Sequence, residues 1–170
     1  MKRFRAAYGR LLEWVVVALM IILFAEVTVG VVFRFAGQSL AWYDELASHL
    51  LAWLTFYGAA LASVKRAHIG CPEVVEMMPW RARRFVNIVA QLIVITFFVL
   101  LGGVGAWIMP VLATDALISL PEIPMSVVES VIPISSLLIV IAETAYLLEL
   151  IAAKNPPRSG GEAALADELQ

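Results

Sequence analysis

The chain alternates long apolar runs with short polar segments. Four runs have the length of a membrane span, and they cover about residues 11–33, 45–64, 85–109 and 127–151. A bilayer core about 30 Å thick needs roughly 20 helical residues to cross it. Lipid offers the backbone no hydrogen-bond partners, and the strict apolar/polar alternation of barrel strands is absent. The pattern therefore predicts an all-α fold, an integral membrane four-helix bundle.

The polar segment between the second and third runs predicts an additional short helix over residues 72–84. Its apolar side chains fall on one helical face, with glutamates opposite: Val74, Val75, Met77 and Met78 against Glu73 and Glu76. Such a helix lies in the headgroup layer of a membrane. The alternative is an irregular loop, broken again at Pro79.

Prolines mark the last span and the tail. Pro121 and Pro124 favour extended structure in the third loop, residues 110–126, and Pro133 predicts a kink in the last helix. The polar, Pro- and Gly-rich residues 155–170 predict a disordered tail after a membrane domain over residues 1–154.

Composition supports a membrane protein. The 170 residues are 62% hydrophobic and 15% charged, whereas soluble domains average about 45–50% apolar and about 25% charged. A net charge of −2 argues against a nucleic-acid partner. The single cysteine, Cys71, excludes an internal disulfide and a multi-cysteine metal site, and no phosphate-binding P-loop motif is present.

The basic residues predict the orientation of the helices. Lys and Arg gather in residues 2–10, 65–84 and 154–158, which a four-helix topology places on one side. The first loop has only Arg34, and the third loop has neither Lys nor Arg. Because short cytoplasmic loops are enriched in Lys and Arg, both termini are expected in the cytoplasm. The first run is too long for a signal peptide, which predicts an uncleaved span.

Four polar residues lie inside the predicted spans. A charged carboxylate such as that of Glu26 or Glu143 costs much free energy in lipid. Each therefore suggests an ion or proton site, or else a structural role as a buried contact with another helix or as a neutral carboxyl group. The contact or neutral group is the favoured interpretation. Asn87 and Gln91 share one helix face, which predicts interhelical hydrogen bonds.

A second group lies near the outer membrane face. Arg34 is close to Asp44 and Glu45, which predicts either an ion pair that pins the first turn or a contact with a periplasmic partner. His49 follows Glu45 by one helical turn and is expected to bond to it. His68, among basic residues, suggests a headgroup or subunit contact. The two histidines are about 28 Å apart along one helix, too far to bind one haem.

Small residues four apart predict close helix packing, as membrane helices use them. These pairs are Gly102 with Ala106, Gly58 with Ala62, and Ala59 with Ser63.

The order of several residues resembles the small permease subunit of tripartite ATP-independent periplasmic (TRAP) transporters, the DctQ-like family. That family shows an Arg, a Gly, Trp-x-x-Glu, a helix rich in small residues, and His-Ile after a basic pair. The corresponding residues here are Arg34, Gly37, Trp42, Glu45, Gly58, Lys65, Arg66, His68 and Ile69. The resemblance extends from about Leu11 to Ile151, and it is carried by order and spacing.

The resemblance implies a scaffold subunit without enzymatic activity, cofactor or metal. Its implied partners are a large TRAP permease subunit, a periplasmic substrate-binding protein that meets the assembled complex, and membrane lipids. The implied transport is uptake of organic anions such as carboxylates, driven typically by a sodium gradient. A membrane anchor of a redox enzyme and a free-standing small transporter are the alternatives, although the second should show an internal repeat or paired broken helices.

Overall fold

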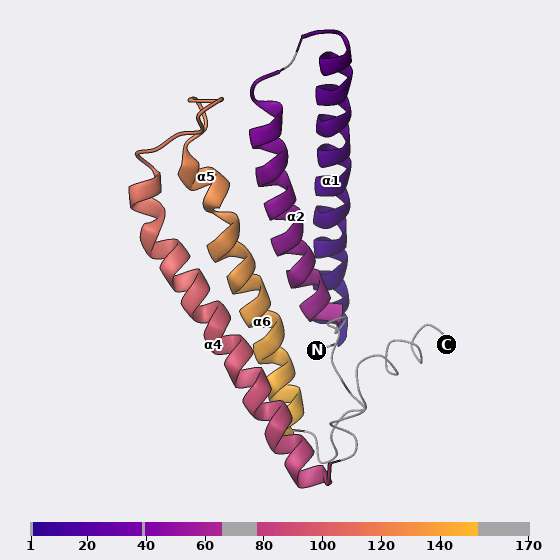
Figure 1. Ribbon diagram of the computed structural model, residues 1–170. Coiled ribbons are helices and arrows are strands. Elements are labelled where there is room, and N and C mark those ends of the chain that lie inside the picture. The colour runs from indigo at the N-terminus through magenta and orange to yellow at the C-terminus, as the bar shows by residue number, and fades with distance from the viewer. Residues whose placement is uncertain (1, 39, 66–77, 153–170) are drawn as a thin grey trace, which may run out of the picture.

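The described part of the chain folds into helices arranged as two antiparallel hairpins. A computed structural model describes residues 2–38, 40–65 and 78–152. Its helices are α1 (Lys2–Phe35), α2 (Tyr43–Lys65), α4 (Trp80–Leu112), α5 (Met125–Glu129) and α6 (Val131–Ala152). Figure 1 shows α1 beside α2, and α4 beside the α5–α6 segment, with the start of α1 and the end of α6 toward the same end of the molecule.

The predicted all-α membrane bundle is confirmed. Within the described residues, four helical segments are long and apolar enough to cross a membrane: Ala7–Phe35, Tyr43–Lys65, Arg81–Leu112 and Met125–Ala152. The helices run beyond the predicted spans because basic residues at a span's end still form helical hydrogen bonds. Helix α4 has 33 residues, about 50 Å at 1.5 Å per residue, so it tilts in the bilayer or projects from it.

The segment predicted as an interfacial helix is divided by the structure. Residues 81–84 belong to α4, which begins at Trp80, so they are no part of a separate helix. Residues 66–77 and the tail after residue 152 lie outside the described residues.

At the opposite end of the molecule, α1 stops at a glycine: Gly37 has φ 78°, and the amide of Gln38 donates to the carbonyl of Phe33 at 3.0 Å. Glycine adopts this left-handed conformation without steric cost.

The two hairpins meet where α2 packs against α6. The centre of this contact is a buried cluster in which Ala60 is 0%, Ile139 1% and Leu12 2% exposed. The small side chain of Ala60 lets the helices approach closely. The hydroxyl of Tyr8 in α1 donates to the carbonyl of Leu138 in α6 at 2.9 Å, which joins a third helix to the same contact. Helix α6 is thus central, with α2 on one side and α4 on another.

Helix α4 packs against α6 through two glycines. A Cβ placed on Gly102 would lie 2.9 Å from the Cβ of Ser136, and one on Gly105 would lie 3.0 Å from Ile132. The close packing expected at Gly102 is therefore present. Ala106 is exposed, and the second close contact with α6 is made by the buried Gly105, so a packing partner for Ala106 stays a prediction. The helix crossing selects a spacing of three residues here instead of four.

The hydrogen bonding of the last span is incomplete near the end that joins the third loop. Helix α5 ends at Glu129 and α6 begins at Val131, so the irregularity falls at Ser130, ahead of the kink expected at Pro133. Pro133 has no N–H to donate to the carbonyl of Glu129, four residues earlier. Pro110, by contrast, lies inside α4, and the third loop begins at Ala113 rather than at residue 110.

The glycine contact predicts opposite effects for two neighbouring substitutions. Gly102→Ala should destabilise the α4–α6 pair by about 1–3 kcal/mol, because the added methyl group overlaps Ser136. Gly103→Ala should stabilise the chain by about 0.5–1 kcal/mol, since a Cβ there meets no atom within 4 Å and alanine favours a helix. Thermal unfolding of the two variants in the same detergent measures both. Equal midpoints would contradict this packing.

Candidate functional site

The end of the molecule where α2 begins is organised by the carboxylate of Glu45, in the first turn of α2. One carboxylate oxygen accepts the amide N–H of Ile118 at 3.1 Å, and the other accepts that of Ser119 at 2.8 Å. The hydroxyl of Ser119 donates to the carbonyl of Ala41 at 3.3 Å. One acidic side chain thereby attaches the third loop to the start of α2, 73 residues away in sequence.

The third loop presents these amides because its own backbone is closed on itself. An isolated antiparallel bridge pairs Ala116 with Pro124, and the amide of Met125 donates to the carbonyl of Asp115 at 2.9 Å. Leu117 is only 3% exposed, while its neighbour Ile118 is 92% exposed. Burial of Leu117 and the closed backbone hold the two N–H groups toward Glu45.

A second contact joins α2 to α5. The indole Nε1–H of Trp53 donates to the carbonyl of Val128 at 2.7 Å. The ring centroids of Trp53 and Tyr57 are 6.2 Å apart. Val128 itself is buried. We refer to the contacts of Glu45, Trp53 and Ser119 as the clasp, because together they hold the third loop and α5 against α2.

The other outer-face residues predicted from the sequence lie near the clasp without entering it. Arg34 is exposed in the last turn of α1, and among the described residues it pairs with neither Asp44 nor Glu45. Of the two roles considered for Arg34, the ion pair is therefore not formed within the described residues, where Glu45 bonds to the loop backbone, and the contact with a periplasmic partner stays a prediction. Trp42 is half-buried, and its carbonyl accepts the first amide bond of α2, from Leu46.

His49 is half-buried one turn after Glu45, but no hydrogen bond joins the two within the described part of the chain. Gly58 is half-buried, and a Cβ there would meet no described atom within 4 Å. His68 lies outside the described residues.

The strongest polar contact inside the spans joins α4 and α6. The side-chain amide of Gln91 donates to the backbone carbonyl of Glu143 at 3.2 Å and also to its carboxylate. Gln91 is 8% exposed and Glu143 4%. Asn87, one turn before Gln91, is half-buried. Glu143 thus acts as a contact between helices, one of the two roles considered for it.

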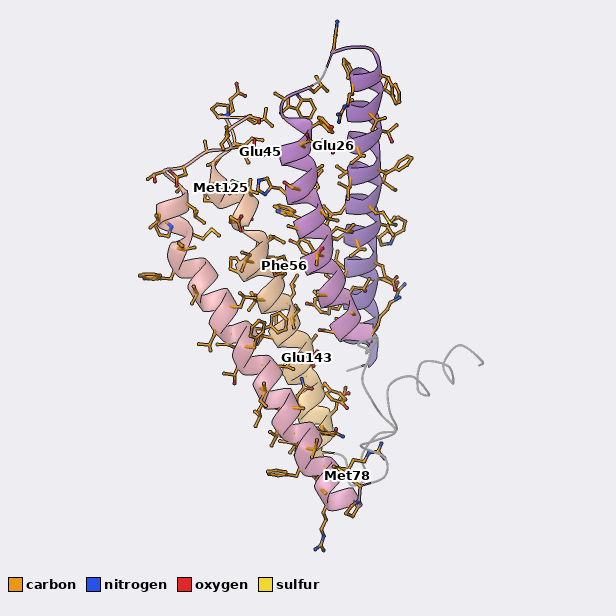
Figure 2. All side chains as sticks on the ribbon, viewed as in Figure 1. Glu26, Glu45, Phe56, Met78, Met125 and Glu143 are labelled. Atoms are coloured by element: carbon orange, nitrogen blue, oxygen red, sulfur yellow. The ribbon has the colours of Figure 1, made fainter. Side chains whose placement is uncertain are left out.

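Glu26 lies in a different environment. It is half-buried on α1, and both of its carboxylate oxygens are shielded from solvent, without a hydrogen-bond partner among the described residues. Figure 2 shows Glu26 toward the same end as Glu45, whereas Glu143 lies much farther toward the other end. The two intramembrane carboxylates therefore do not form one site. The described residues also contain no group of three His, Cys, Asp or Glu that could hold a metal.

Three further contacts were not anticipated from the sequence. Tyr43 covers Gly30, where a Cβ would lie 2.8 Å from the ring's Cγ. Lys65 at the end of α2 pairs with Glu13 of α1, with Nζ and Oε1 2.5 Å apart. A guanidinium nitrogen of Arg84 donates to the carbonyl of Ile151 at 2.9 Å, near the end of α6. Basic residues at helix ends were the available signal, since they favour helix C-terminal carbonyls.

The fold and its contacts define a multi-span membrane protein whose polar side chains largely join its own helices. A family described as tripartite ATP-independent periplasmic transporters, DctQ component, matches residues 19–153. The match covers well over half of the chain, so the chain belongs to the DctQ family, the small component of TRAP transporters. A search of curated proteins gave no match.

The Gln91–Glu143 contact predicts a characteristic pattern of stability. Gln91→Leu should destabilise the protein by about 1–3 kcal/mol, because it removes a hydrogen-bond donor from a buried carboxyl group. Adding Glu143→Leu should recover much of the loss, because the buried carboxyl group that lost its donor is then removed as well. Thermal unfolding in detergent measures both variants. Asn87→Leu is the control on the same helix, and an equal loss for Asn87→Leu would show that the contact has no special role.

Proposed function

We propose that the chain is the supporting membrane subunit of a TRAP-type secondary transporter. Its partners are a large permease subunit and a soluble periplasmic substrate-binding protein. The transporter imports organic anions such as carboxylates, driven by an ion gradient, typically of sodium. Membership of the DctQ family supports the transport role, and the resemblance described above supports the division of labour among subunits.

The observation that most favours a supporting role is the use of polar groups inside the spans. A secondary transporter needs a substrate site near the bilayer midplane, usually built from broken helices with free polar groups. In this chain, Gln91 and Glu143 bond to each other. The hydrogen bond that Pro133 cannot donate to Glu129 is missing toward one end of the last span, Met125–Ala152. This arrangement supports packing against a larger partner rather than transport by the chain alone.

The partner and the lipids would occupy the outward faces of the helices. Large apolar side chains are exposed on both α1 and α4, including Phe24 at 73% and Trp107 at 81%. In a membrane, such faces contact lipid tails or another membrane protein, and van der Waals packing determines which. The proposal assigns part of this surface to the large permease.

The proposed location is the bacterial inner membrane, with both termini in the cytoplasm. The basic segments support this orientation, and the start of α1 and the end of α6 lie toward one end of the structure (Figure 1). Met78, exposed and toward that same end (Figure 2), provides a reporter position. Labelling of a cysteine at Met78 by an impermeant reagent from outside intact cells would contradict the orientation.

Reconstitution in liposomes tests the proposed function. Uptake of a labelled carboxylate under a sodium gradient should require this chain, the large permease and the binding protein together. Liposomes that contain this chain alone should show the background rate, because it offers no central site. The chain should also co-purify with the large permease.

In the matched control, the Gly103→Ala variant takes the place of the native chain in the full set. This substitution alters an open position on α4 and should leave uptake intact. Sodium-driven uptake by the chain alone, at the rate of the full set, would contradict the supporting role and favour a self-sufficient carrier.

A further inference from the structure

The third loop and α5 connect α4 to the last helix at the end of the molecule where α2 begins, and α5 packs against α4. We call residues 113–129 the outer cap. Its covalent connections are to the end of α4 and to Ser130 before α6. Its side-chain hydrogen bonds to another helix, within the described residues, go to α2 and the residues just before it: Glu45 accepts from residues 118 and 119, Ser119 donates to Ala41, and Trp53 donates to Val128.

The junction at Ser130 has the features of a hinge. Ser130 keeps helical dihedral angles, φ −58° and ψ −20°, between the last residue of α5 and the first of α6, so the chain path stays helical while its hydrogen-bond ladder is incomplete. Pro133 removes the amide that would bond to the carbonyl of Glu129 across the junction. A local bond remains, from the Ser130 hydroxyl to the carbonyl of Val127 at 2.6 Å. The cap therefore turns relative to α6 with less disruption than a continuous helix would permit.

The contact with Glu45 has the features of a latch. A single carboxylate holds two backbone amides, so loss of one group releases both. Ile118 is 92% exposed, and residues 113–124 lie outside the candidate spans, so water can bond to the amides after release. Burial of Leu117 and Val128 favours the closed position. The cap thus has a closed arrangement held by α2 and an open one supported by solvent.

We propose that the outer cap is a hinged element, with Glu45 of α2 as its latch and Ser130 as its hinge. Opening separates the cap from α2, while α5 stays beside α4 and α6 keeps its packing. Because α5 leads directly into α6, a molecule that contacts the cap shifts the balance between the two positions. This proposal concerns the chain's own conformations and does not depend on the proposed transport function.

Distance measurements between spin labels test the hinge in the full-length chain in lipid nanodiscs, with Cys71→Ser as background. One pair of labels, at the exposed positions 38 and 122, measures the cap against the α1–α2 turn. A second pair, at positions 38 and 134, measures α6 against the same turn; Ile134 is 45% exposed. Glu45→Ala should broaden the first distribution and shift it to longer distances, and should leave the second unchanged.

Asp44→Ala is the matched control, since it removes an exposed charge one residue away and should change neither distribution. Glu45→Gln keeps one acceptor oxygen and should give a smaller broadening of the first pair, which preserves the test if Glu45→Ala fails to fold. An unchanged first distribution in a folded Glu45 variant would overturn the latch. Equal broadening of both pairs would overturn the hinge, because α6 would then have moved with the cap.

Discussion

The packing of α2 against α6 is the contact on which the rest of the structure depends, because it joins the two hairpins. Lipid tails are as apolar as the side chains, so burial of apolar area alone does little to hold membrane helices together. Close approach and hydrogen bonds must supply the stability. Both are present, since Ala60 is fully buried at the crossing and Tyr8 and Trp53 donate to backbone carbonyls of α6 and α5.

The use of polar side chains for contacts within the fold also explains why a supporting role suits this chain. Each of the strongest polar side chains in the described part serves the fold: Gln91 joins α4 to α6, and Glu45 joins α2 to the third loop. Glu26 differs, since its shielded carboxylate has no hydrogen-bond partner among the described residues. A bundle built this way offers its partner a stable apolar surface more readily than it offers a small anion a binding site.

The sequence was sufficient for the number of spans and for the helical class, because length and hydropathy alone determine both. It was insufficient for contacts between distant segments. Glu45 follows Asp44 in the sequence and has Arg34 near it, yet its partners are the backbone amides of residues 118 and 119. Nearly every residue has such an amide, so the pattern of side chains does not identify these two. The choice of Gly105 over Ala106 depends on the crossing of α4 and α6, which no local spacing specifies.

The most direct test of the α2–α6 contact is association of the two hairpins as separate chains. When the chain is divided between residues 65 and 78 and both parts are produced in one membrane, they should co-purify. Ala60→Phe should abolish this association, because Ala60 is 0% exposed, while Ala62→Phe should preserve it, because Ala62 is only half-buried. Equal recovery of the partner hairpin with the two variants would contradict the account.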